Sequence, residues 1–212
     1  TDAEPVTIIE GDCLEVMKHL PKGVIDAVVT DPPYGLGSRL AGGTWGAKFS
    51  GGLEWDKGPP PSIYDITKLG KYAAVWGGNY CELPPSRGWL VWHKRDSVPT
   101  TADVELCWTN IDMNSRLVDC TIAQTNPERL GHPTQKPLKV MEFTINSLPK
   151  DVGLILDPFG GSGTTAEAAI RLGKKCIIVE REPKYVAIIR KRIALALGRD
   201  KSQLTSLLAE DA

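Results

Sequence analysis

The stretch GLILDPFGGSGTT, residues 153–165, decides the fold of this chain. It begins as a short aliphatic run, which predicts a buried strand over residues 153–156. Asp157 and Pro158 end that strand, and a glycine-rich turn then leads into an alanine-rich segment, 166–172, that is typical of a helix. A strand, a glycine turn and a helix in this order bring backbone N–H groups close to a nucleotide-like ligand.

A carboxylate ends the next predicted strand, residues 176–179. Glu180 stands at this position, where a carboxylate can accept both hydroxyl hydrogens of a ribose. The pattern Gly161-x-Gly163-x-x-Ala166 also satisfies the dinucleotide fingerprint, so an NAD-dependent oxidoreductase is one alternative. A tight turn without a ligand is another, because short glycine turns are common in proteins.

The sequence DPPY at residues 31–34 follows another aliphatic run, residues 24–30. Two consecutive prolines cannot continue an inner strand, so Asp31 and Tyr34 are expected beyond its carboxyl edge, where open α/β sheets bind ligands. The Asp31 carboxylate and the Pro32 carbonyl are acceptors that can draw the hydrogens of an exocyclic base amine toward tetrahedral geometry. Tyr34 offers a ring on which a base rotated out of its helix can stack. A strand-ending turn with no catalytic role is the alternative.

These motifs resemble the DNA amino-methyltransferases, which transfer a methyl group from S-adenosylmethionine (SAM) to adenine N6 or cytosine N4. The residues Asp31, Pro32, Pro33 and Tyr34 resemble the family's catalytic DPPY. Residues 157–163 resemble its cofactor loop, and HPTQKP, residues 132–137, resembles a segment that reaches the amino-acid end of SAM. The resemblance implies that SAM is bound by Asp12, Cys13, Thr134, Lys136, Asp157, Phe159, Gly160, Gly161, Ser162, Gly163, Thr164 and Glu180.

The order of the motifs is informative about the fold. The catalytic turn precedes the cofactor loop, as in the family's circularly permuted β class, which implies a three-layer, Rossmann-like α/β fold with a mostly parallel sheet. We expect one methyltransferase domain over residues 1–212, with a long flexible loop at 35–61. A separate target-recognition domain is not expected, because too few residues separate Gln124 from His132.

The periodicity of the sequence predicts the remaining elements. Strands are expected at 6–9, 72–76, 89–92, 105–108 and 117–123. Helices are expected at 13–20, 63–69 and 137–148, and from Pro183 onward.

The charge balance limits how DNA can be bound. The chain has 25 Lys and Arg against 26 Asp and Glu, so phosphates must be met by a local basic patch. The candidate DNA contacts are Arg39, Lys48, Lys57, Lys94, Arg95 and Arg129. The basic run at 190–192 is a weaker candidate, because a basic stripe opposite an apolar helix face is usually solvated.

Five widely spaced cysteines without a CxxC pair fit neither a disulfide framework nor a zinc site. They predict a cytoplasmic protein without a metal. We expect no membrane association, because no apolar run approaches the roughly 20 residues that span a bilayer.

The resemblance favours a homodimer and adenine N6 as the methylated atom, since DPPY is more similar to the adenine members. Cytosine N4 is the alternative, and a SAM- or DNA-binding module without activity is a further one.

Overall fold

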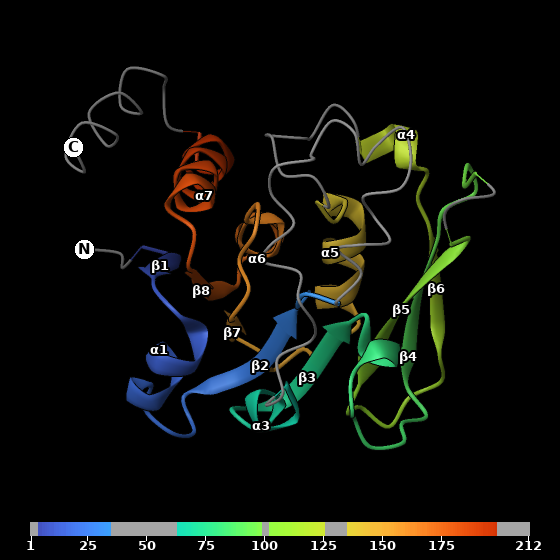
Figure 1. Ribbon diagram of the computed structural model, residues 1–212, viewed down its shortest axis with the longest axis horizontal. Coiled ribbons are helices and arrows are strands. Elements are labelled where there is room, and N and C mark those ends of the chain that lie inside the picture. The colour runs from blue at the N-terminus through green and yellow to red at the C-terminus, as the bar shows by residue number, and fades with distance from the viewer. Residues whose placement is uncertain (1–3, 35–62, 99–101, 126–134, 199–212) are drawn as a thin grey trace.

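The computed structural model describes residues 4–34, 63–98, 102–125 and 135–198. In these residues, eight strands form one sheet in the order β1-β8-β7-β2-β3-β5-β4-β6 (Figure 1). The strands are β1 (Val6–Glu10), β2 (Ile25–Thr30), β3 (Gly70–Trp76), β4 (Trp89–His93), β5 (Val104–Thr109), β6 (Arg116–Asp119), β7 (Leu154–Asp157) and β8 (Lys175–Glu180). The helices are α1 (Cys13–His19), α3 (Ile63–Thr67), the 3-10 helix η2 (Gly78–Tyr80), α4 (Ile122–Thr125), α5 (Leu138–Asn146), α6 (Thr164–Arg171) and α7 (Pro183–Ala196).

The direction of the strands gathers the sequence motifs at one edge of the sheet. Strands β1, β8, β7, β2 and β3 pair in parallel, so their carboxyl ends lie along the same edge. Strand β5 runs antiparallel to both β3 and β4, which brings its amino end to this edge. The predicted mostly parallel sheet is therefore confirmed.

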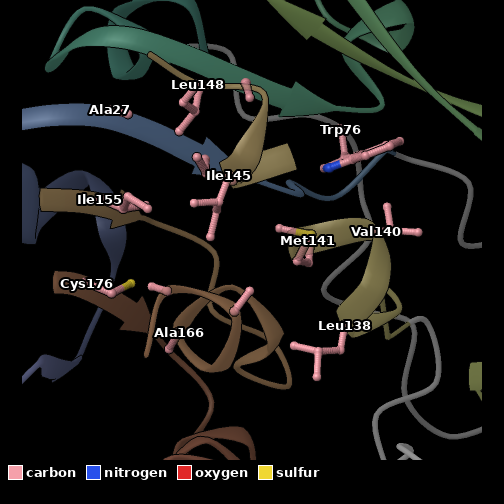
Figure 2. Packing of buried hydrophobic residues seen from close by; sticks show 14 of the residues in the cluster. Ala27, Trp76, Leu138, Val140, Met141, Ile145, Leu148, Ile155, Ala166 and Cys176 are labelled. Atoms are coloured by element: carbon pink, nitrogen blue, oxygen red, sulfur yellow. The ribbon is translucent and has the colours of Figure 1, made fainter. Parts of the chain in front are cut away.

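Helices cover both faces of the sheet, as the predicted three-layer fold requires. Ala27 and Val29 on β2 belong to a buried cluster with residues of α5, α6 and α7. Figure 2 shows labelled side chains of this cluster, with Ala27 and Ile155 coming from the sheet and Ile145 and Ala166 from α5 and α6. Val28, which points the other way, packs in a second cluster with residues of α1 and α3. Burial on both faces explains why most residues of β2 and β7 are apolar.

One predicted element is wrong in its second half. A single strand over residues 117–123 was expected, but the strand ends at Asp119 and α4 begins at Ile122. The Asp96 carboxylate accepts hydrogen bonds from the backbone N–H groups of Ile122 and Ala123, at 2.6 and 2.9 Å. This acceptor pairs with two of the N–H donors at the start of the helix, and it comes from a distant part of the chain. The other predicted strands and helices are present.

Several predictions fall outside the described residues. They are the loop at 35–61, with Arg39, Lys48 and Lys57, and the residues Arg129 and Thr134. All five cysteines are described, and none forms a disulfide. None of the helices in the described ranges is long and apolar enough to cross a membrane.

Candidate active site

The DPPY turn directly follows β2 at the carboxyl edge of the sheet, and it meets Lys136 there. Lys136 Nζ lies 2.9 Å from each carboxylate oxygen of Asp31. The Tyr34 hydroxyl donates a hydrogen bond to the same carboxylate and lies 2.9 Å from Lys136 Nζ. The Lys136 side chain is 6% exposed and that of Asp31 is 26% exposed. Two motifs that are far apart in the sequence therefore form one partly enclosed polar cluster.

Glu105 extends this cluster into a chain of alternating charges. Its carboxylate forms ion pairs with Lys136 Nζ at 2.7 Å and with Lys94 Nζ at 2.6 Å. Burial opposes the ionisation of Glu105, but the two ammonium groups outweigh it and lower its pKa to about 2. Burial raises the pKa of Asp31, and Lys136 only partly opposes this increase. Of the two carboxylates, Asp31 is the better proton acceptor.

Tyr34 is held between an aromatic ring and a glycine. Its ring stacks on Tyr80 with the centroids 5.2 Å apart and an interplanar angle of 26°. On another side it lies against Gly77, where an added Cβ would be 2.0 Å from Tyr34 Cε1. Gly77 also has φ +68°, which only glycine adopts without strain. The end of β3 therefore leaves space for the tyrosine of the DPPY turn.

The cofactor loop begins at Asp157, the last residue of β7. Asp157 is 2% exposed and accepts hydrogen bonds from the Thr30 hydroxyl at 2.9 Å and from the Phe159 N–H at 3.1 Å. Burial raises the pKa of this carboxyl to about 7. Asp157 thus joins the loop to β2 from inside the fold.

The glycines of the loop permit close packing against neighbouring elements. A Cβ at Gly160 would lie 2.7 Å from Ile178 on β8, and Gly163 has φ +79° beside Ile189 on α7. The Gly160 N–H donates to the Val179 carbonyl at 2.8 Å. Ser162, Gly163 and Thr164 are buried at the start of α6, whereas Phe159 is half-buried.

Glu180 supports the same loop from the end of β8. It accepts hydrogen bonds from the N–H groups of Gly161 at 2.7 Å and Glu182 at 2.8 Å, one on each carboxylate oxygen. Burial raises its pKa. Since a carboxylate offers about four acceptor positions, Glu180 keeps the capacity to bind two further donors such as ribose hydroxyls.

The turn after β1 lies next to β8, because the Gly11 N–H donates to the Glu180 carbonyl at 3.0 Å. Asp12 is exposed and caps α1 by accepting the Leu14 N–H at 2.8 Å. Cys13, predicted as a cofactor contact, is buried in the core, and this burial raises its pKa to about 11. Asp12 and Glu180 thus lie at the ends of adjacent strands, as a ligand spanning them requires.

A buried arginine joins three segments around the cofactor loop. Arg192 on α7 is 3% exposed, and its Nε donates to the Ser162 carbonyl at 2.7 Å. Its two terminal nitrogens donate to Glu167 on α6 at 2.6 Å and to the Gln135 amide oxygen at 2.8 Å. Gln135 immediately precedes Lys136, so the arginine connects the cofactor loop with the segment that reaches Asp31. The basic run at 190–192 is thus not wholly a solvated stripe.

The described candidates for DNA contacts are Lys94 and Arg95, after the end of β4. Lys94 is 9% exposed, and its charge is already paired with Glu105. Arg95 is exposed and pairs with Asp119 at 2.6 Å. Among the residues that the structure describes, no group of three or more His, Cys, Asp or Glu side chains is placed to hold a metal ion.

Glu105 and Arg192 belong to the site, although none of the sequence motifs includes them. The sequence does contain an indication of both, since each is a charged residue in a segment that is otherwise predicted to be buried. Glu105 precedes the apolar run of β5, and Arg192 lies between Ile189 and Ile193 on the apolar face of α7. A charge at such a position is rarely buried without a partner, so it indicates a specific polar contact.

The site can be compared with known proteins. A model of the DNA methylase family matches residues 72–191. The type II methyltransferase M.HinfI of Haemophilus influenzae is 28% identical over an alignment 250 residues long, gaps included, that covers 88% of this chain and 68% of the relative. The crystal structure of the M1.HpyAVI–SAM complex matches with a TM-score of 0.60 at 23% identity, over 88% of this chain and 99% of that one. The cytosine-N4-specific PvuII DNA methyltransferase matches with a TM-score of 0.62 at 20% identity, over 95% and 90% of the two chains.

The family match overturns the alternative of an NAD-dependent oxidoreductase. The matched segment contains Lys136, the cofactor loop and Glu180, which the structure places along one edge of the sheet with the DPPY turn. This chain therefore belongs to the DNA methylase family of SAM-dependent N6/N4 methyltransferases, as its motifs predict.

Proposed function

We propose that this protein methylates adenine N6 in DNA, with cytosine N4 as the second candidate. The observation that carries the proposal is the cluster of Asp31, Tyr34 and Lys136 beside the cofactor loop. The DPPY form of the catalytic turn favours adenine, whereas the fold alone is shared with a cytosine-N4-specific enzyme. A base amine of either kind needs the same acceptors.

The residues of the catalytic turn act on the target amine in three ways. The Asp31 carboxylate and the Pro32 carbonyl accept the amine hydrogens, and the prolines Pro32 and Pro33 hold both acceptors rigidly. Tyr34, already stacked on Tyr80, extends an aromatic surface to the flipped base. Because burial raises the pKa of Asp31, this carboxylate can also hold the proton that the amine loses.

The residues along the edge fit SAM. Glu180 has remaining acceptor capacity for ribose hydroxyls, Asp12 presents a carboxylate at the adjacent strand end, and Phe159 offers a half-buried ring. SAM supplies an electrophilic methyl group when bound. The protein's part is to hold the ribose and adenine ends across β8 and β1, so that the reacting end lies toward β2 and Asp31.

DNA recognition is proposed to depend on few protein residues. Within the described residues, α4 and the segment up to Thr125 leave little chain before Gln135, which supports a single domain without a separate target-recognition domain. A protein of this kind reads a short target or relies on a second copy of itself. Residues 35–61 follow Tyr34 directly, so their basic residues are proposed to contact the phosphates near the flipped base.

The experiment is incubation of the protein with DNA and SAM carrying a labelled methyl group, followed by nucleoside analysis. We expect N6-methyladenine in the wild type, and a loss of about 10² to 10³ in rate for Asp31→Asn, which removes the carboxylate acceptor. The Asp31→Asn protein should still bind SAM by calorimetry. N4-methylcytosine alone would overturn the choice of adenine, and no methylated base would indicate a module without activity.

A further inference from the structure

Both carboxylate oxygens of Asp31 already accept hydrogen bonds from the protein's own donors. Lys136 Nζ lies 2.9 Å from both carboxylate oxygens, and the Tyr34 hydroxyl donates to the same group. Three of its roughly four acceptor positions are thus occupied, so a target amine that approaches this carboxylate competes with Lys136 for the oxygens. The donor that moves must keep a partner, because an unpaired ammonium that is 6% exposed is costly.

Lys136 has such a second partner within reach. Glu105 Oε2 lies 2.7 Å from Lys136 Nζ, while its other oxygen lies 2.6 Å from Lys94 Nζ. The ammonium of Lys136 is therefore already shared between two carboxylates. A small movement away from Asp31 leaves it paired with Glu105, which Lys94 holds in place.

We propose that Glu105 is a positioning residue for methyl transfer: it holds Lys136 when Asp31 exchanges the lysine for the target amine. This inference rests on the proposed function of Asp31 as the amine acceptor. Glu105 does not contact the base in this scheme and acts only through Lys136. Its place in the fold suits the role, because the antiparallel direction of β5 brings Glu105 to the edge where β2 delivers Asp31.

The charge of Glu105 also affects the ionisation of Asp31. The titratable groups that face Asp31 are Lys136, Glu105, Tyr34, Cys107 and Asp157. Burial is the largest cause of the raised pKa of Asp31, Lys136 lowers it, and the negative charge of Glu105 raises it. Removal of that charge should lower the pKa of Asp31 and bind Lys136 more tightly to it.

The test compares wild type, Glu105→Gln and Glu105→Asp by the pH dependence of kcat on an unmethylated DNA target and by calorimetric affinity for SAM. In Glu105→Gln we expect the plateau of kcat to fall about tenfold to a hundredfold, because the acceptor stays occupied by Lys136. The acid limb of the pH profile of this variant should move to lower pH, while its affinity for SAM stays unchanged. Glu105→Asp keeps the charge and should restore the position of the acid limb. The matched control is Asp112→Asn, because Asp112 is an exposed carboxylate that pairs with Arg87 at the opposite edge of the sheet.

Two measurements keep the test decisive. The double variant Glu105→Gln with Lys94→Gln removes one charge of each sign, so it preserves neutrality if the single variant does not fold, and it should show the same changes. Titration of the Asp31 carboxyl by ¹³C NMR in the free protein tests the coupling to Glu105 without catalysis. An unchanged plateau and acid limb in folded Glu105→Gln protein, or an unchanged Asp31 titration in that variant, would overturn the role of Glu105. If the proposed function itself is wrong, the wild type will be inactive, but the titration of Asp31 will still depend on Glu105.

Discussion

Arg192 on α7 donates from its Nε to the Ser162 carbonyl at 2.7 Å, so the last described helix is tied directly to the cofactor loop. The same guanidinium pairs with Glu167 and bonds to Gln135, one residue before Lys136. The guanidinium reaches these three acceptors from three different nitrogens, whereas the three donors of a lysine come from a single nitrogen. The loop that we propose to bind SAM and the lysine that contacts Asp31 thus depend on one side chain.

Replacement of Arg192 by methionine should destabilise the protein and weaken SAM binding. The change leaves the buried carboxylate of Glu167 without its closest partner, and loss of one member of a buried pair costs about 3 to 5 kcal/mol. Chemical denaturation and calorimetry measure the two effects. Lys191→Met, an exposed position on the same helix, is the control and should change neither. Equal stability of the two variants would contradict this account.

Replacement of Gly77 by alanine should lower kcat through Tyr34. The new Cβ would be 2.0 Å from Tyr34 Cε1, so the ring must leave its position over the catalytic turn. Gly173→Ala is a close control, because its φ is +65° and nothing lies within 4 Å of the added Cβ. Both variants should lose about 1 to 2 kcal/mol of stability from the left-handed backbone. A turnover rate that is equally affected in both would show that the position of the Tyr34 ring is unimportant.

Glu180 should contribute to SAM affinity both by direct contact and by support of the loop. Glu180→Ala removes both effects, whereas Glu180→Gln keeps one acceptor oxygen that can hold the Gly161 N–H. Calorimetry should therefore rank SAM affinity as wild type, then glutamine, then alanine. Phe159→Ala should also weaken binding. Unchanged affinity in both Glu180→Ala and Phe159→Ala would refute the assignment of this edge to SAM.

Asp157 should make stability depend on pH. Burial raises its pKa to about 7 in the folded protein, against about 3.9 in an unfolded chain. The folded state then binds more protons than the unfolded state between these values, so the contribution to stability is present below about pH 4 and is lost as the pH rises through about 7. Asp157→Asn cannot ionise and should show a flatter fall in stability between about pH 4 and pH 7 by urea denaturation. A fall as steep as in the wild type would assign the pH dependence to Asp31 or Glu180, whose pKa values are also raised.

Simultaneous replacement of Arg39, Lys48 and Lys57 by alanine should weaken DNA binding and reduce its salt dependence by up to about three phosphate contacts. Affinity for SAM should remain, because these residues are separate in sequence from the cofactor loop. DNA binding is measured by fluorescence anisotropy over a series of salt concentrations. An unchanged salt slope would direct attention to Arg95 and Arg129.

The sequence by itself determined the fold class and the identity of the two central motifs. Proline pairs and glycine turns after aliphatic runs are local signals, since they depend on missing N–H donors and on backbone angles that neighbouring residues cannot change. They located Asp31 and the loop from Asp157 at strand ends. Because parallel strands end at a common edge, the same signals predicted that the two motifs lie together.

Only the tertiary structure decided which side chains complete the site. The local sequence contains no information on the ion-pair partners of Lys136, which are Asp31 and Glu105. Asp31 follows β2, Glu105 lies on β5 and Lys136 precedes α5, so these contacts join segments that are far apart in the chain. The end of β6 likewise depends on Asp96, whose carboxylate starts α4 from a distance in sequence. Arg192 read as one residue of a basic run, yet the packing of α7 on α6 buries it against Ser162 and Glu167. Burial makes an unpaired charge costly, so these distant partners, set by the packing of elements, decide where each charged group lies.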